Sequence, residues 1–156
     1  MRRKRQKLQQ KDAYDILLKN KEGVLALNDE YAYALPINYF YDQEQKALFF
    51  HGAKEGKKLD LIKKDPKASF CVIDKKDIVK EEYTTYFKSV IVYGKIEIIE
   101  DKEELKSAIT KMAKRFFPED DEDNRNYYIE KDFKQLMMFK LKIKEITGKC
   151  AIELLK

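Results

Sequence analysis

The residues best suited to chemistry lie in one short stretch, residues 49–60. It contains the single histidine, a loop with two glycines and a pair of adjacent lysines. These residues are His51, Gly52, Ala53, Gly56, Lys57 and Lys58. Glycines let backbone N–H groups turn toward an anion, and a helix N-terminus adds a partial positive charge. Lysines are unfavourable at a helix start unless an anion is bound there, so the stretch predicts a phosphate site.

The elements around this stretch agree with that interpretation. Residues 46–50 are apolar and aromatic and predict a strand. Residues 57–64 predict a short helix, because Leu59 and Ile62 recur at helical spacing before Pro66 ends it. The glycine spacing is neither a Walker loop nor a dinucleotide-binding fingerprint. A solvated loop in a lysine-rich chain is therefore the alternative.

The composition predicts one globular domain over residues 1–156. The hydrophobic fraction is 44%, with 10 Tyr and 9 Phe, which is enough to form a core. The net charge of +5 suits a small anionic ligand but does not require a nucleic acid. Residues 1–11 form a basic arm, which we expect to be a mobile, solvated terminus rather than a nucleic-acid or membrane contact.

Cysteine and histidine usage argues against a disulfide framework and against a metal site. Cys71 and Cys150 are far apart, and His51 is the one histidine. Cys71 lies in an apolar segment and is expected to be a buried thiol. No apolar run reaches transmembrane length and no signal-peptide pattern begins the chain, so we expect a cytoplasmic protein without membrane contact.

The early strands predict a flat ligand surface. Residues 24–27 form one expected strand, and residues 31–41 form a second with a period of two. The second strand places small or polar side chains on one face, among them Ala34, Pro36 and Asn38. That face leaves room for a flat molecule or a close-packed neighbour. Pro36 cannot donate to a ladder, so it marks an edge, a bulge or a ligand contact.

The remaining segments complete a mainly β fold with flanking helices. Strands are expected at residues 68–74, 86–100 and 136–147, with a charged surface loop at 75–82. Gly94 inside the long strand predicts a bend or bulge. Helices are expected at 12–20 and after a capping box at 101–104, and the acidic run 119–123 is expected to be a solvated loop. Six hairpin-connected β segments predict a small closed or split barrel with packed edges.

The order of these parts resembles the FMN-binding split barrels related to pyridoxamine 5'-phosphate oxidase, and within them the nitroimidazole-resistance (Nim-like) branch. The resemblance covers nearly the whole chain, and it lies in the order and spacing of several short motifs. They are Leu35-Pro36-Ile37-Asn38-Tyr39, Phe50-His51-Gly52-Ala53, Gly56-Lys57-Lys58-Leu59-Asp60-Leu61-Ile62, Asp65-Pro66-Lys67, Ser89-Val90-Ile91-Val92-Tyr93-Gly94-Lys95 and Ile146-Thr147-Gly148-Lys149.

The resemblance implies a six-stranded antiparallel split β-barrel that binds FMN at a homodimer interface. Under it, one group of residues would hold the phosphate and ribityl end, namely His51, Gly52, Ala53, Gly56, Lys57 and Lys58. A second group would lie along the isoalloxazine ring, namely Pro36, Ile37 and Asn38. Ser89 and Val90 would close the site from the long strand. An anion and a flat apolar body are what the residues by themselves suggested.

The resemblance also implies an oxidoreductase that reduces a small organic substrate, such as a nitroaromatic, with electrons from a transient donor such as a nicotinamide. The oxidases of this family that make pyridoxal phosphate carry arginine-bearing motifs on the early strand and at the C-terminus. Here the early strand has no arginine and residues 151–156 lack one, which argues against pyridoxamine phosphate as substrate. His51 is a catalytic candidate, although we favour a role in hydrogen bonding the cofactor or a backbone carbonyl.

Three alternatives remain open. The first is a non-catalytic flavin-binding stress or sensor protein, which turnover alone would distinguish. The second is a nucleic-acid module that uses the basic arm, which predicts salt-dependent binding lost on deletion of residues 2–7. The third is another ligand in the same fold, such as haem or a deazaflavin. The lone histidine keeps haem among these ligands, although it is not a favoured one.

Overall fold

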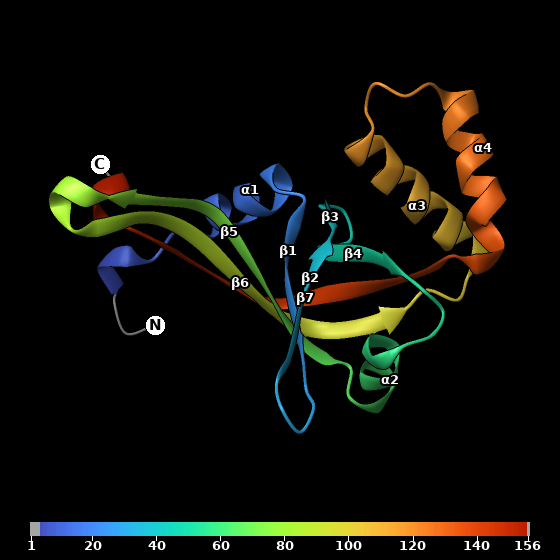
Figure 1. Ribbon diagram of the computed structural model, residues 1–156, viewed down its shortest axis with the longest axis horizontal. Helices are drawn as coiled ribbons and strands as arrows, with labels where there is room; N and C mark the ends of the chain where they lie inside the picture. Colours follow the sequence, from blue (N-terminus) through green and yellow to red (C-terminus); the bar gives the residue numbers. More distant parts are fainter. Residues whose placement is uncertain (1–3, 156) are drawn as a thin grey trace.

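A curled antiparallel sheet forms the centre of the molecule in the computed structural model, which describes residues 4–155 (Figure 1). The strands are β1 Glu22–Leu27, β2 Tyr33–Asn38, β3 Phe40–Asp42, β4 Ala47–Gly52, β5 Lys67–Val79, β6 Thr84–Ile98 and β7 Met137–Cys150. The α-helices are α1 Gln10–Lys19, α2 Lys57–Lys64, α3 Lys102–Phe116 and α4 Glu122–Asp132. Helices α3 and α4 lie at one end of the sheet, and the β5–β6 hairpin extends toward the other end.

The sheet curls because its two edge strands are consecutive in the sequence. The strand order is β2-β1-β5-β6-β7-β4-β3, so β2 and β3 lie at opposite edges. Only Tyr39 separates them along the chain. Its amide donates to the carbonyl of Lys21 at 2.8 Å, and its side chain is completely buried. The chain therefore brings the two edges together, and the mainly β split barrel expected from the sequence is confirmed.

Residues 4–155 form seven strands, whereas the sequence predicted six. The expected single strand over residues 31–41 is divided at Tyr39 into β2 and β3. Strict alternation fails there because Tyr39 and Phe40 are both buried, in different places. Tyr39 packs in the barrel interior, whereas Phe40 packs with Phe49 in a second core beneath α3.

Two expected loops are partly regular structure. The loop expected at residues 75–82 was wrong over its first half, because β5 continues to Val79 and pairs with β6 from Thr84 onward. Neither β1 nor β7 pairs with this part of the hairpin, so its charged residues remain solvated. The acidic run at 119–123 contains the start of α4. The Asp121 carboxylate caps that helix by accepting the Asn124 amide at 2.8 Å.

The bend predicted at Gly94 is confirmed. The register between β6 and β7 shifts at Tyr93 and Gly94. A Cβ atom at Gly94 would overlap the carbonyl oxygen of Lys142 on the neighbouring strand. The close approach of two backbones therefore requires glycine at this point of the barrel.

Helix α1 closes the barrel interior, and the basic arm precedes it in the sequence. Ala13, Ile16 and Leu17 are buried in the main core. The described part of the arm is not a solvated terminus as expected, because Leu8 is also buried and its amide donates to the carbonyl of Gly148 at 3.0 Å. Residues 1–3 of the arm lie outside the described residues.

The last four carbonyl groups of α1 accept hydrogen bonds from side chains outside the helix. Asn20 Nδ2 donates to Ile16 O at 2.9 Å. Tyr39 Oη donates to Leu17 O at 2.9 Å, and burial raises the pKa of this phenol, which keeps the proton on it. Arg115 Nη2 of α3 donates to Leu18 O and Lys19 O at 2.7 and 2.8 Å. These contacts satisfy the groups that a helix end leaves unpaired and fix α3 relative to α1.

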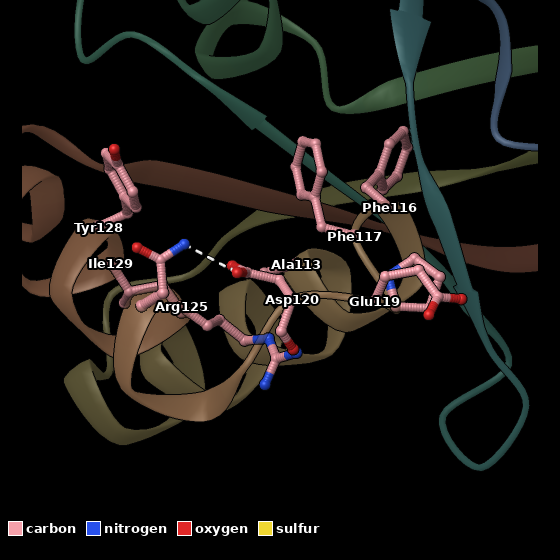
Figure 2. A pocket seen from close by; sticks show the side chains of 10 residues that line it. Ala113, Phe116, Phe117, Glu119, Asp120, Arg125, Tyr128 and Ile129 are labelled. Atoms are coloured by element: carbon pink, nitrogen blue, oxygen red, sulfur yellow. Dashed lines mark hydrogen bonds between the residues drawn. The ribbon is translucent and has the colours of Figure 1, made fainter.

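Helix α3 packs on the outside of β4 and β7, and α4 packs against α3. Leu105, Ala108 and Met112 of α3 cover the second core. Between the C-terminal end of α3 and the first half of α4 lies a pocket lined by aromatic and apolar side chains (Figure 2). The chain passes from one helix to the other through residues 117–121, and residues 117–120 line this pocket.

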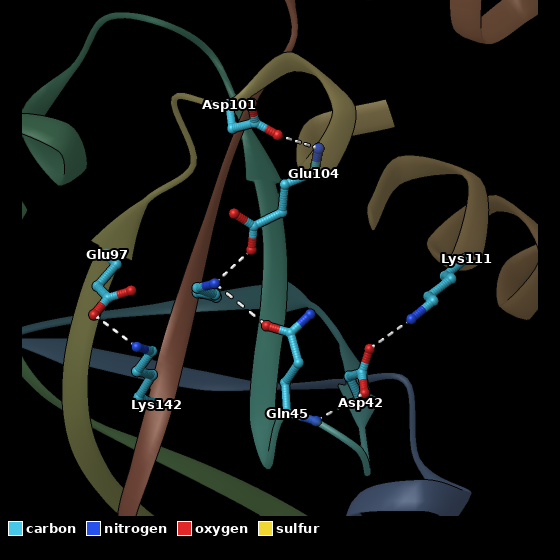
Figure 3. A network of polar contacts seen from close by, with 8 residues as sticks. Asp42, Gln45, Glu97, Asp101, Glu104, Lys111 and Lys142 are labelled. Carbon is cyan, nitrogen blue, oxygen red and sulfur yellow. Dashed lines mark hydrogen bonds and ion pairs between the residues drawn. The ribbon is translucent and has the colours of Figure 1, made fainter. Parts of the chain in front are cut away.

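Ion pairs hold α3 on the sheet (Figure 3). Asp101 caps the helix by accepting the Glu104 amide at 2.8 Å, as the capping box predicted. Glu104 in turn accepts from Lys140 of β7. At the middle of the helix, Lys111 Nζ lies 2.8 Å from Oδ2 of the buried Asp42. The second core and these polar contacts together explain why α3 has a fixed position.

Candidate functional site

The end of β4 and the start of α2 meet as the sequence stretch at 49–60 predicted. A Cβ atom placed on Gly52 would lie 2.9 Å from Nζ of Lys58. The same Nζ lies 5.5 Å from the ring centroid of Phe139, which pairs with Phe50 in the ladder. The Lys58 side chain therefore folds back from α2 across the end of β4. Glycine at position 52 leaves space for the ammonium group in this position.

Lys58 carries a positive charge that the protein does not neutralise. Its side chain is half-buried, and desolvation by burial lowers the pKa of its ammonium group. Within residues 4–155, no carboxylate pairs with Lys58 and no hydrogen-bond acceptor is in contact with its Nζ. A partly desolvated cation without a partner is unfavourable by itself, and an anionic ligand would compensate it.

The N-terminus of α2 adds further donors at the same place. Its N-cap residue is Gly56, which has a φ of 127° and provides no side-chain acceptor for the first turn. A Cβ atom on Gly56 would meet nothing within 4 Å, so the space beside it is open. The start of α2 therefore offers uncapped N–H groups and an unpaired lysine, which together are a suitable environment for a phosphate.

Lys57 has a different environment from its neighbour. Its Nζ lies 2.8 Å from Oδ2 of Asp29 and 4.9 Å from the ring centroid of Tyr33. The hydrogen bond between them lowers the pKa of the Asp29 carboxyl and raises the pKa of Lys57. Lys57 thus connects α2 to the turn between β1 and β2. Its positive charge is already paired.

His51 and Ala53 lie at the exposed end of β4. The neighbouring Phe50 points into the barrel, and His51 points to the opposite side, where its ring remains accessible. Partial desolvation, followed by the nearby Lys58 ammonium group, lowers the pKa of His51. The imidazole is therefore neutral at neutral pH and offers one donor and one acceptor nitrogen.

The predicted ring-binding residues lie on the edge strand β2. Pro36 and Asn38 are exposed on the outer face, as their alternation predicted, and Ile37 is half-buried toward the barrel interior. Strand β2 pairs with β1 on one side and ends the sheet on the other. Its free edge leaves backbone groups available to a ligand, although Pro36 itself has no N–H to donate.

The two residues expected to close the site lie elsewhere in the protomer. The Val90 side chain is 1% exposed in the barrel core, so Ser89 is the member of the pair that faces outward. Ser89 precedes Ile98 by nine residues, which is about 30 Å of extended strand. Ile98 pairs with Phe139, next to the Lys58 ammonium group. Within one chain, the residues predicted to bind the phosphate therefore lie together, and Ser89 lies apart from them.

An uncovered apolar surface on the outer face of the sheet was not predicted. Ladder pairing places five residues in one row across β2, β1, β5, β6 and β7: Pro36, Val24, Cys71, Ile91 and Thr147. Val24 and Ile91 are 39% and 37% exposed. Cys71 is half-buried on this face and is not the fully buried thiol expected. The sequence did contain a signal for this surface. The segment from Ala68 to Ile73 is apolar on both faces, which indicates that both faces of the strand are covered.

Ser89 lines a shallow depression on this surface. The depression has a volume of about 500 Å³. Its other residues are Ile91, Tyr93, Glu145, Thr147 and Lys149. We call the row and the depression together the outer sheet surface.

The residues at the start of α2 fit the phosphate of a flavin nucleotide. Lys58 supplies an unpaired charge, the uncapped turn after Gly56 supplies donors, and the space beside Gly56 is open. The free edge of β2 supplies backbone groups for the polar side of a flat ring. The same arrangement fits the phosphate of FMN and that of a larger flavin nucleotide.

A curled antiparallel sheet with these features defines a split-barrel protein. A sequence model described as pyridoxamine 5'-phosphate oxidase matches residues 9–150, and the chain belongs to this family. A search of curated protein sequences found no significant match.

Solved structures agree with the fold. A protein proposed to confer 5-nitroimidazole antibiotic resistance in Bacteroides thetaiotaomicron is similar, with a TM-score of 0.78 and 20% identity over 92% of this chain and 85% of the other. An FAD-binding protein from Mesorhizobium loti has a TM-score of 0.67 and 20% identity, covering 93% and 96%. An FAD- and haem-binding protein from Mycobacterium smegmatis has a TM-score of 0.76 and 17% identity, covering 95% and 74%.

The described part of the chain holds no helix long and apolar enough to span a membrane.

Proposed function

We propose that this protein binds FMN through the start of α2 and acts as an oxidoreductase on a small organic substrate. The observation that carries the proposal is the unpaired, partly desolvated Lys58 beside the uncapped first turn of α2. Membership of the pyridoxamine 5'-phosphate oxidase family and the similarity to FAD-binding proteins support a flavin as the ligand. Bound FMN would supply two-electron transfer between a donor and an acceptor.

The chain's own residues have distinct tasks in this proposal. Lys58 and the first-turn N–H groups of α2 bind the phosphate, and Lys57 holds the adjacent turn in place through Asp29. The free edge of β2 near Pro36 and Asn38 orients the ring through backbone groups. Neutral His51 donates or accepts one hydrogen bond at the cofactor. A small substrate, for which a nitroaromatic is our first candidate, would stack on the open face of the ring.

A homodimer is part of the proposal because one protomer separates its candidate residues. Ser89 lies nine residues, about 30 Å of extended strand, from Ile98, which pairs with Phe139 beside Lys58. If Ser89 and Lys58 both contact the same cofactor, they come from different protomers. The outer sheet surface, with exposed Val24, Ile91 and Tyr93, would then be covered by a second copy.

The first experiment is the visible spectrum of the freshly purified protein, followed by heat release and chromatographic identification of the chromophore. We expect flavin bands and released FMN. Released FAD would support the site and correct the nucleotide. A colourless protein that also fails to bind added FMN or FAD would contradict the proposal. In that case the start of α2 would be an ordinary loop.

The second candidate function is a non-catalytic flavin-binding protein with a stress or sensor role. The observation that favours it is the scarcity of acid–base groups among the candidate residues, where His51 is the one side chain that titrates near neutral pH. Turnover distinguishes the two functions. The flavin-loaded protein is mixed anaerobically with a nicotinamide donor and then with a nitroaromatic acceptor. Stoichiometric product over many cycles supports the oxidoreductase, and reduction without turnover supports the sensor.

A further inference from the structure

The pocket between α3 and α4 is separate from every residue assigned to the flavin site. Its volume is about 840 Å³, within the range of small-molecule sites. The walls are mainly aromatic and aliphatic, with Phe116 and Phe117 on one side and Tyr128 and Ile129 on the other (Figure 2). Phe117 and Tyr128 are 66% and 55% exposed, so both rings are accessible to a ligand.

Arg125 gives this apolar pocket a buried positive charge. The residue lines the pocket and is only 8% exposed. Its Nη2 donates to the backbone carbonyl of Asp120 at 2.6 Å, and its buried Nε has no hydrogen-bond partner. Within residues 4–155, no carboxylate forms an ion pair with it. A guanidinium group stays charged in proteins, and a buried charge is normally paired.

The acidic residues nearby are directed elsewhere. The Asp120 carboxylate accepts from Asn124 Nδ2 at 2.7 Å. The Asp121 carboxylate caps α4 through the Asn124 amide. The Glu119 side chain points away from Arg125 in Figure 2. The guanidinium group is therefore left with donors that the protein does not use, although carboxylates are close in sequence.

We propose that this pocket binds a small organic acid with an aromatic or branched apolar body. The carboxylate would accept from the guanidinium of Arg125, and the apolar body would lie between Phe117 and Tyr128. An arginine fork matches the two oxygens of a carboxylate, and the apolar walls exclude water from the pair. The site depends neither on the bound flavin nor on the reaction proposed above.

The test uses three probes with the same apolar body: 3-phenylpropionate, 3-phenylpropan-1-ol and 3-phenylpropylamine. Binding is followed by amide chemical shifts of the full chain. We expect the acid to bind at least tenfold more tightly than the alcohol, with shifts confined to residues 113–129. Preference for the amine, shifts centred elsewhere, or no shifts at millimolar acid would each overturn the proposal.

Variants identify the group that selects the acid. Arg125→Met keeps the apolar stem and should reduce the affinity for the acid to that for the alcohol. Lys114→Met removes an exposed charge from α3 outside this pocket and should leave the selectivity unchanged. If Arg125→Met does not fold, Tyr128→Ala tests the pocket instead. This variant should weaken the binding of the acid and of the alcohol by similar factors. Retained selectivity for the acid in Arg125→Met would contradict the proposal.

Discussion

Nζ of Lys57 lies 2.8 Å from Oδ2 of Asp29, so the first residue of α2 is bound to the turn between β1 and β2. The next residue, Lys58, has no such partner within the described residues and lies over the ring of Phe139. Two adjacent lysines with the same charge therefore have different tasks. One fixes the position of the helix start, and the other leaves a charge available there.

This difference predicts unequal effects on cofactor affinity. Lys58→Met should weaken FMN binding by about 1.5–3 kcal/mol, because one charge-assisted contact to the phosphate is lost. Lys57→Met should change it much less, since the charge of Lys57 is already paired with the Asp29 carboxylate. Quenching of FMN fluorescence on binding measures both. Riboflavin, which lacks the phosphate, is the control and should not distinguish Lys58→Met from the wild type.

Equal losses of FMN affinity in the two variants would contradict the separate tasks of Lys57 and Lys58. An unchanged affinity in Lys58→Met would remove the phosphate site from the start of α2.

His51 should report on the same site through its pKa. Desolvation and the Lys58 ammonium group lower it in the folded protein, so the folded chain binds this proton less readily than the unfolded chain. Stability should therefore fall as the pH decreases through the unfolded value, about 6.5. Above that value both states are neutral, and His51 should contribute no pH dependence.

The measurement is a proton NMR titration of His51, which is the one histidine and gives a single assignable C2–H signal. Lys58→Met should raise the pKa toward its ordinary value, because one of the two causes is removed. Bound FMN should raise it further through the phosphate charge. A pKa that responds to neither change would place the phosphate away from His51.

The sequence predicted local structure well wherever short-range chemistry decides it. The bounds of α2 were predicted at residues 57–64, because the apolar spacing and Pro66 both act locally. The Asp101 cap and the bend at Gly94 were predicted for the same reason. The division at Tyr39 was missed, because the second core that buries Phe40 is built by α3, far along the chain.

The candidate site was predicted in part. The residues from His51 to Lys58 are close in sequence, and the structure brings them together. Their separation from Ser89 depends on the register of β4, β6 and β7, which local patterns do not contain. The different environments of Lys57 and Lys58 depend on Asp29, a contact that no periodicity indicates. Arg125 gave no signal, because its acidic neighbours suggested an ordinary solvated loop.

Substitution of two glycines tests where the fold requires a residue without a side chain. Gly94→Ala should destabilise the protein by about 3 kcal/mol, because a Cβ would overlap the backbone of Lys142 and the bulge cannot adjust freely. Gly52→Ala should leave the melting temperature nearly unchanged, since only the flexible end of Lys58 must move. It should still weaken FMN binding by displacing that ammonium group. Thermal unfolding and FMN titration of both variants separate the two effects, and a neutral Gly94→Ala would contradict the assigned bulge.

The hydroxyl of Tyr39 should matter for stability more than its position between two strands suggests. Tyr39→Phe leaves the Leu17 carbonyl at the end of α1 without its donor, at an expected cost of about 1–2 kcal/mol in the free energy of unfolding. Tyr31→Phe is the matched control and should be neutral, because Tyr31 is 84% exposed. Urea unfolding compares the two. Equal stability of both variants would show that the Leu17 carbonyl finds another donor.

The outer sheet surface gives the sharpest test of the proposed dimer. Ile91 is the fourth of the five residues in the row and is 37% exposed, so Ile91→Asp places a charge on this surface without entering the core. We expect the variant to sediment near the 18.6 kDa of one chain, whereas the wild type sediments near twice that mass. Ile78→Asp, on the solvated part of the β5–β6 hairpin, is the control and should remain dimeric.

If Ser89 of one copy completes the cofactor site of the other, the Ile91→Asp monomer should also lose FMN affinity. A monomer that retains full affinity would assign the whole cofactor site to one chain and leave Ser89 outside it.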